Sequence, residues 1–212
     1  MTVLVCVAHP DDEVLGCGAT IAKLSKKEKV ITVIFSYGDA WPPWMVDKKD
    51  LIKTRVKESK LAAEILGVKK TYFMGLKDTR VEAEWDVNKE KALHRLFEKY
   101  KPSKVFTHTA RDKHVDHAAV NKIVNKELRK QKLLGREIKA YYFEINFWSF
   151  LNSGEPVFVF DVSKTFGKKL EALDMFESQK SLMIFLKPMV IAKAYFYGKE
   201  HGYERAEYYF KE

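Results

Sequence analysis

The strongest constraint on this chain is a dense group of ionisable residues directly after a buried-strand pattern. Residues 2–7 (TVLVCV) are uninterrupted apolar or β-branched residues, which is typical of a strand buried on both faces of a sheet. Residues 8–13 (AHPDDE) then bring one imidazole and three carboxylates to the end of that strand. Burying so many ionisable groups is unfavourable unless something binds them, and a divalent metal would do so. Helix capping by Asp11 or Asp12 is the alternative, but a cap needs only one such residue.

Strand and helix patterns alternate along the chain to about residue 180. We expect strands over 2–7, 30–35, 71–74, 104–107, 138–143 and 156–162, and helices over 14–24, 51–66, 88–100, 118–131 and 168–177. This alternation predicts an α/β fold, a Rossmann-like layered arrangement with a mostly parallel central sheet flanked by helices. The 212 residues are expected to form one domain, with a core over 1–180 and a C-terminal rim or interface segment over 181–212.

A second group of histidines and aspartates follows the fourth strand, in residues 107–117 (THTARDKHVDH). In the doubly wound strand order 3-2-1-4, the first and fourth strands are neighbours. Their carboxyl ends then flank the crevice in which ligands bind. We therefore expect the two densest His/Asp clusters of the chain to meet there, although they are far apart in sequence.

The residue types and spacings in both clusters are those of a catalytic metal site. His9 and Asp12 are spaced i, i+3, as are His114 and His117, which puts each pair on one side of a helical turn. Two histidines and one aspartate leave an open position on zinc, and a zinc-bound water has a pKa of about 7. Asp11 could take the proton of that water.

Spacing alone leaves open which of His114 and His117 binds the metal. His117 lies at the start of the following helix, where the dipole favours the neutral imidazole that metals bind, so His117 is favoured as the ligand. The other histidine would stabilise the oxyanion or protonate the leaving amine.

Taken together, residues 8–13 and residues 114–117 (HVDH) resemble the LmbE/PIG-L family of zinc-dependent N-deacetylases. Shorter matches extend the resemblance almost from end to end: Arg55 with Glu58, 62–68 (AAEILGV), 75–78 (GLKD), 178–179 (SQ) and 206–207 (AE). The resemblance implies a hydrolase that removes the acetyl group from an N-acetylglucosamine-containing conjugate.

The resemblance also implies a role for each residue of the two clusters. His9, Asp12 and His117 would be the zinc ligands, Asp11 the general base, and His114 the imidazolium that faces the tetrahedral intermediate. Iron or another divalent ion is the alternative to zinc at such a site.

Two further residues, Arg55 and Asp78, would by the same resemblance hydrogen-bond sugar hydroxyls of the substrate. The alternatives are structural. Arg55 could form a surface ion pair with Glu58 or Glu82, and Asp78 could form its own turn.

Three carboxylates near the clusters are expected to support the site rather than bind the metal. Asp112 and Asp116 are interpreted as partners that orient a histidine. Glu13 is expected either to do the same or to lie at the helix N-terminus.

The loop after the second strand departs from the glycine-rich acidic loop that the family often has. Residues 36–44 (SYGDAWPPW) contain Asp39, Trp41 and Trp44, which we interpret as a possible substrate loop. The tryptophans could stack on a sugar face or pin the loop onto the core. The sequence therefore leaves the substrate open, and a zinc amidase acting on another N-acyl compound, such as an antibiotic or a lipid-linked sugar, is an alternative.

A non-catalytic nucleotide- or metal-binding Rossmann-like module is a further alternative. The first strand–helix turn lacks the G-x-G-x-x-G loop that binds phosphates, which argues against nucleotide binding. The net charge of +9 comes from lysines in scattered runs with no aromatic residues interleaved. We interpret them as a solvated surface and expect no nucleic-acid partner.

Cellular context is predicted from cysteines and apolar segments. Cys6 and Cys17 have small apolar neighbours, which indicates buried thiols in a reducing compartment. With no secretory leader before the first strand, we expect a cytoplasmic enzyme. Residues 182–197 are apolar and aromatic but too short to span a membrane, so we expect no stable membrane insertion. We assign them to the rim of the site or to an interface of a homo-oligomer.

Overall fold

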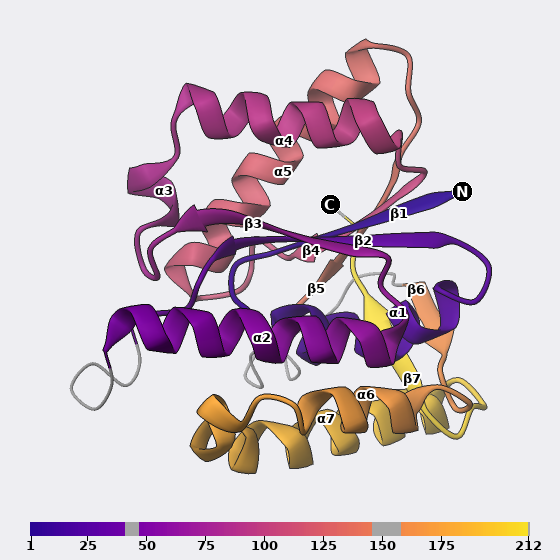
Figure 1. Ribbon diagram of the computed structural model, residues 1–212. Coiled ribbons are helices and arrows are strands. Elements are labelled where there is room, and N and C mark those ends of the chain that lie inside the picture. The colour runs from indigo at the N-terminus through magenta and orange to yellow at the C-terminus, as the bar shows by residue number, and fades with distance from the viewer. Residues whose placement is uncertain (41–46, 146–157, 212) are drawn as a thin grey trace.

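The computed structural model, which describes residues 1–40, 47–145 and 158–211, is a layered α/β fold (Figure 1). Its five-stranded sheet has the order β3-β2-β1-β4-β5, and every neighbouring pair is parallel. The strands are β1 (Thr2–Val7), β2 (Lys29–Ser36), β3 (Lys70–Leu76), β4 (Lys104–His108) and β5 (Lys139–Phe143). The predicted fold class and the predicted order of the first four strands are confirmed.

Helices cover both faces of this sheet (Figure 1). One face carries α3 (Val81–Glu84), α4 (Val87–Tyr100) and α5 (Val115–Leu133), and the other carries α1 (Asp12–Leu24), α2 (Lys48–Leu66) and α6 (Phe166–Leu173). Val3, Val5 and Val7 of β1 pack on the side of α1 and α2, whereas the alternate residues Leu4 and Cys6 pack on the side of α4 and α5. Burial on both sides explains why β1 is apolar without alternation.

The C-terminal part differs from the sequence prediction. The strand expected over 156–162 does not extend the parallel sheet: β6 (Phe158–Asp161) pairs antiparallel with β7 (Ala206–Tyr209) in a second sheet. Residues 180–200 form one helix, α7 (Lys180–Glu200), after the short 3₁₀ turn η2 (Glu177–Gln179). The sequence showed no helical period there because α7 is apolar on nearly all sides. β7 brings Tyr209, which is fully buried, into the main core.

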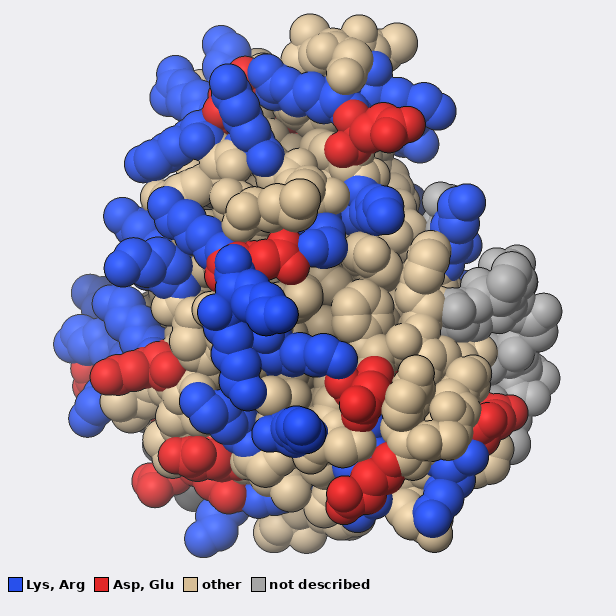
Figure 2. All heavy atoms as spheres, turned by 90° about the vertical axis from the view of Figure 1, so that its right-hand side faces the viewer, with Lys and Arg blue, Asp and Glu red and all other residues tan. Residues whose placement is uncertain are grey.

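Basic residues gather at the amino-terminal ends of the strands of the sheet. β2, β3, β4 and β5 each begin with a lysine, and Figure 2 shows the face on which many Lys and Arg side chains lie. Lys29 Nζ lies 4.9 Å from the ring centre of Tyr100, and Lys70 Nζ lies 5.0 Å from that of Tyr72. The fold therefore interleaves lysines with aromatic rings, which the sequence did not show because these residues come from separate elements. This end of the sheet lies opposite both His/Asp clusters.

Close packing at Gly16 of α1 provides a test of the fold. A Cβ added there would lie 2.2 Å from Cδ2 of Phe143 in β5, whereas one added at Gly167 of α6 would have no heavy atom within 4 Å. We expect Gly16→Ala to lower the free energy of unfolding by about 1–3 kcal/mol, because the ring must move. Gly167→Ala is the control and should change it by less than about 1 kcal/mol. Urea titrations measure both, and equal stabilities of the two variants would contradict this packing.

Candidate active site

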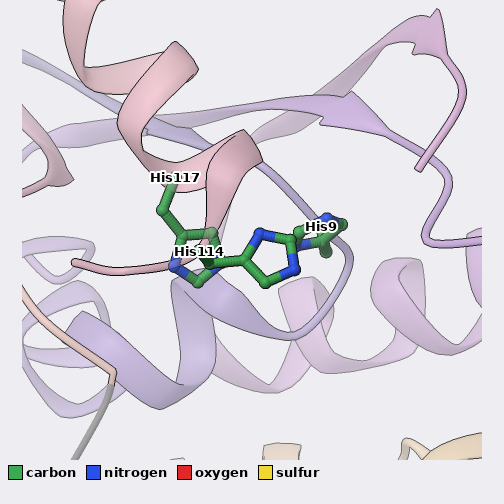
Figure 3. A group of neighbouring side chains, drawn as sticks. All are labelled: His9, His114 and His117. Atoms are coloured by element: carbon green, nitrogen blue, oxygen red, sulfur yellow. The ribbon is translucent and has the colours of Figure 1, made fainter. Parts of the chain in front are cut away.

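The carboxyl ends of β1 and β4 bring the two His/Asp clusters together. His9 follows β1, and His114 and His117 lie at the start of α5 (Figure 3). The ring centres of His9 and His114 are 4.8 Å apart, and those of His114 and His117 are 4.6 Å apart. The strand order thus brings histidines of both clusters, residues 8–13 and residues 107–117, into one group.

The carboxylate of Asp12 lies at the centre of this group. Its Oδ2 is 3.2 Å from Nδ1 of His9 and 3.4 Å from Nε2 of His117, and it accepts the backbone N–H of His9 at 2.8 Å. Ligand atoms about 2.0–2.1 Å from a tetrahedral zinc ion lie about 3.3 Å from one another, so this spacing fits a metal. The donor set of two nitrogens and one carboxylate oxygen fits zinc as well.

Three groups among the described residues have ligand atoms within 4.8 Å of one another. They are His9 with His114 and His117, Asp12 with His108 and His117, and His9 with Asp78 and Asp116. The three predicted zinc ligands are distributed over the first two groups. Their assignment remains a prediction.

His117 is held by a carboxylate on the side away from Asp12. Its Nδ1 lies 2.9 Å from Oδ2 of Asp112, which also accepts the backbone N–H of Ile145 at 3.4 Å. Such a contact keeps the proton on Nδ1 and leaves the electron pair of Nε2 directed at Asp12, which suits a metal ligand. Burial lowers the pKa of His117, but Asp12 and Asp112 outweigh it and raise that pKa to about 9.

His9 is held in the same way. Its Nε2 lies 3.1 Å from Oδ2 of Asp116 and 3.1 Å from Oδ1 of Asp78, while its Nδ1 faces Asp12. Asp116 is itself fixed by the backbone N–H groups of Thr79, at 2.6 Å, and of Val81, at 3.1 Å. The structure therefore places both predicted orienting aspartates against predicted metal ligands.

His108 is the member of the site that the sequence did not single out. It is fully buried, and its ring stacks on that of His117 with centres 3.9 Å apart. Its Nε2 lies 3.1 Å from the backbone nitrogen of Ala8 and 3.3 Å from Oδ2 of Asp12. Whether it accepts from the first or donates to the second, no electron pair is left there for a metal. Burial and the charge of His117 lower the pKa of His108 to about 4.

The strand order could have pointed to His108. Cys6 of β1 is paired with Thr107 of β4, so the residue after Thr107 lies at the same end of the sheet as the first cluster. His108 belongs to the second cluster, residues 107–117, but it has no candidate ligand three residues away that would single it out. In the structure it supports the ring of His117 from behind.

Asp11 lies next to Asp12 in a strained backbone conformation. Its φ is 115°, and although it occupies the N-cap position of α1, its side chain makes no capping hydrogen bond. The capping alternative is therefore wrong for Asp11. Burial and the charge of Asp12 raise the pKa of Asp11 to about 7, against the opposing effect of Arg55. A carboxylate with such a pKa can accept and return a proton at neutral pH.

Glu13 supports this strained turn. Its carboxylate accepts the backbone N–H of Asp11 at 3.1 Å and the hydroxyl of Ser59 in α2 at 3.4 Å. Burial raises the pKa of Glu13 to about 8. The side chain thus lies behind Asp11, and it belongs to none of the candidate metal groups of the described residues.

Arg55 is buried beside Asp11, and no residue that the structure describes pairs with it. Among the residues that the structure describes, its guanidinium forms no hydrogen bond or ion pair, and its Nε is buried and unpartnered. Glu58 bonds to the backbone and hydroxyl of Ser178 at 2.8 and 2.6 Å, and Glu82 pairs with Lys122. The surface ion pair considered for Arg55 is therefore wrong. An unpaired buried cation favours a polar or anionic group on a ligand.

Asp78 joins the loops that follow β2 and β3. Its carboxylate accepts the backbone N–H of Ala40 at 3.2 Å, and its own N–H donates to Asp39 at 3.0 Å. Burial raises the pKa of Asp78, but the contact with His9 lowers it to about 2. The turn-forming alternative is not what is observed, because this carboxylate bonds outside its own turn. Trp41 and Trp44, the other members of the possible substrate loop, lie outside the described residues.

His114 is the most accessible histidine of the cluster. Its Nδ1 accepts the backbone N–H of Asp116 at 3.3 Å, which caps α5 and leaves the proton on Nε2. Burial and the charges of His117 and His9 lower the pKa of His114. The lowered pKa favours a neutral ring that can donate a hydrogen bond from Nε2, which differs from the imidazolium that the family resemblance implies.

Comparison with known proteins gives a consistent result. A family model described as PIG-L, GlcNAc-PI de-N-acetylase, matches residues 4–127. YaiS of Escherichia coli, an uncharacterised deacetylase, is 32% identical over 124 residues, which cover 56% of this chain and 63% of that relative. A probable N-acetyl-α-D-glucosaminyl L-malate deacetylase of Bacillus cereus is 28% identical over 192 residues, covering 86% of this chain and 85% of the relative.

Solved structures agree with the fold. The N,N'-diacetylchitobiose deacetylase of Pyrococcus horikoshii, complexed with an inhibitor, has a TM-score of 0.79 and 24% identity, covering 99% of this chain and 82% of that one. GalB, a 4-carboxy-2-hydroxymuconate hydratase of Pseudomonas putida, has a TM-score of 0.81 and 20% identity, covering 100% and 97%. Because the second protein catalyses a different reaction, the fold by itself does not fix the chemistry.

Proton release on metal binding tests the electrostatics of the cluster. Burial lowers the pKa of His9, but Asp12 and its hydrogen-bonded carboxylates raise it well above its ordinary value, and that of His117 is about 9. A metal binds neutral imidazole, so below pH about 9 it must displace these protons, and its affinity should rise with pH. Calorimetry in buffers of different ionisation enthalpy measures the release. An affinity for Zn²⁺ that is constant between pH 6.5 and 9 would contradict it.

Proposed function

Because the chain belongs to the PIG-L family, whose model matches residues 4–127, we propose that it is a zinc-dependent N-deacetylase. Its substrate is a conjugate that contains N-acetylglucosamine, and its products are acetate and the free amine. The single observation that carries this proposal is the buried Asp12 carboxylate with a histidine nitrogen 3.2 Å away on one side and another 3.4 Å away on the other. The strained Asp11 lies directly beside it.

The substrate class is argued from relatives and from the site together. The Bacillus cereus relative and the Pyrococcus horikoshii structure are named for two different compounds, and both names contain an N-acetylated glucosamine unit. The guanidinium of Arg55, which has no partner among the described residues, supports binding of a polar substrate next to Asp11. Asp78 is the second proposed sugar-binding residue, although its carboxylate also contacts His9.

His9, Asp12 and His117 would hold the ion, with zinc preferred and iron as the alternative metal. When bound, zinc supplies an open coordination position and makes a water nucleophilic at neutral pH. Asp112 and Asp116 keep the outer ring nitrogens protonated so that the inner electron pairs remain available.

The proton steps fall to Asp11 and His114. Asp11 takes a proton from the attacking water as the oxygen adds to the acetyl carbon. The Nε2–H of His114 donates a hydrogen bond to the carbonyl oxygen as negative charge develops there. Asp11 then returns its proton to the nitrogen, the C–N bond breaks, and acetate leaves from the free amine.

Substitution of Asp11 and of His9 separates catalysis from metal binding. Asp11→Asn should keep zinc but lower kcat for acetate release by about 10²–10⁴-fold, because the amide cannot accept the proton. His9→Ala should lose both zinc and activity. Elemental analysis gives the metal content, and acetate release from a panel of N-acetylglucosamine conjugates gives the activity.

Chelation is the control for that experiment. Removal of the metal should abolish acetate release, and added zinc should restore it. An enzyme that is indifferent to chelation, or turnover that survives in Asp11→Asn, would contradict the proposal. Activity only on N-acyl compounds without the sugar would favour the broader amidase alternative.

We further propose that α7 forms a subunit interface of a homo-oligomer. Its outward side chains are apolar and 36–71% exposed: Leu182, Ile184, Phe185, Ile191, Tyr195 and Phe196. Several large apolar side chains exposed on one helix are typical of an interaction site. No helix among the described residues is long and apolar enough to cross a membrane. The free, buried thiols of Cys6 and Cys17 support a cytoplasmic location.

A charge on this face should disrupt assembly. Phe185→Asp is expected to reduce the molar mass measured by light scattering, because it places a carboxylate in the interface. Leu133→Asp is the control, since Leu133 is 88% exposed on α5, which lies on the other side of the sheet from α7 (Figure 1). A wild-type protein that is monomeric would contradict the interface.

A further inference from the structure

The helix that carries Asp12 is broken after its first turn. Cys17 has φ −145° and ψ 21°, which are not helical, and a glycine lies on each side of it. In a regular helix the N–H of Ala19 would bond to the carbonyl of Leu15, and the next pair would follow the same pattern. A break at Cys17 removes this connection between the first turns, which begin at Asp12, and the rest of α1.

Two charged side chains bond to the backbone groups on either side of the break. The carboxylate of Glu207 in β7 accepts the N–H of Ala19 at 3.2 Å and the N–H of Thr20 at 2.7 Å. The ammonium of Lys169 in α6 donates to the carbonyl of Leu15 at 2.8 Å. One side chain therefore caps the second half of α1, and the other bonds to the end of its first half.

These two side chains also form a buried ion pair. Nζ of Lys169 lies 2.6 Å from Oε1 of Glu207, and the side chains are only 4% and 5% exposed. Tyr209 donates its hydroxyl to Thr20 at 2.7 Å and lies 3.1 Å from the Glu207 carboxylate. Removing one member of such a pair leaves the other charge buried and uncompensated.

We propose that the Lys169–Glu207 pair positions Asp12 for metal binding by fixing the two halves of α1 relative to each other. This inference rests on the proposed zinc site. Asp12 is the first residue of the leading half, and its carboxylate must meet a nitrogen of His9 in the turn before α1 and one of His117 in α5. With the backbone connection broken at Cys17, the direction of that half is held from outside, by elements from the C-terminal part of the chain.

The test compares zinc affinity in variants of two ion pairs. Glu207→Gln should weaken zinc binding at least about tenfold, as loss of supporting contacts does at other metal sites, and should lower kcat more than it raises KM. Competition with a chromophoric chelator measures the affinity, and calorimetry measures the stability of the metal-free protein. Tyr209→Phe removes hydroxyl contacts but keeps the pair, so it should weaken binding less.

Glu28→Gln is the matched control. Glu28 pairs with Lys104 through both carboxylate oxygens at 2.7 Å, at the edge of the sheet where strands begin. Loss of this ion pair should lower the stability of the metal-free protein without changing its zinc affinity. The double variant Lys169→Gln with Glu207→Gln removes both charges and should recover part of the affinity lost in Glu207→Gln.

The outcomes separate this inference from the proposed function. A wild-type protein that binds no zinc overturns both. A wild type that binds zinc, with Glu207→Gln binding equally tightly, overturns the positioning role alone. Equal losses of zinc affinity in Glu207→Gln and in Glu28→Gln also overturn it, because general destabilisation would then explain both. If Glu207→Gln fails to fold, the double variant decides the question, because it leaves no unpaired buried charge: zinc binding as tight as in the wild type would overturn the positioning role.

Discussion

The structure depends on one buried negative charge, the carboxylate of Asp12. Its Oδ2 lies within 3.4 Å of ring nitrogens of His9, His108 and His117, which come from the ends of two strands and the start of a helix. Isolated, such a charge would be very unfavourable in the interior. The site is therefore built in layers around it. Imidazoles surround the Asp12 carboxylate, and a second set of carboxylates, including Asp112, contacts the outer nitrogens of those imidazoles. Each layer compensates the charge of the one before.

Sequence reasoning was successful where a local pattern and a general rule of topology coincide. The strand patterns gave the alternation, and the doubly wound order then placed His9 beside His114 and His117 without any contact information. Arg55 could be named only through the family resemblance, since a lone arginine on a helix has no pattern of its own. Its lack of a partner among the described residues became visible only in three dimensions.

What could not be predicted shares a physical cause. α7 is apolar on nearly every side, so it has no helical period in the sequence, and β6 and β7 pair across a long stretch of chain. His108 has no candidate ligand three residues away in the sequence that would single it out. Glu207 falls in one of the short family matches, residues 206–207, but nothing local signals that its side chain meets Lys169 inside the protein, because charged side chains usually are exposed. Long-range polar contacts leave no periodic trace in a sequence.

Gly16 of α1 limits how residues 8–13 could be transferred into another protein. The ring of Phe143 occupies the space that a side chain at Gly16 would need, so this segment must contain a residue that disfavours helix by about 1 kcal/mol relative to alanine. Residues 8–13 alone are thus not enough to build the site in another protein. A scaffold that received it would also need a glycine at the contact, an aromatic ring to fill the gap, and a distant acid–base pair delivered from the other end of the chain.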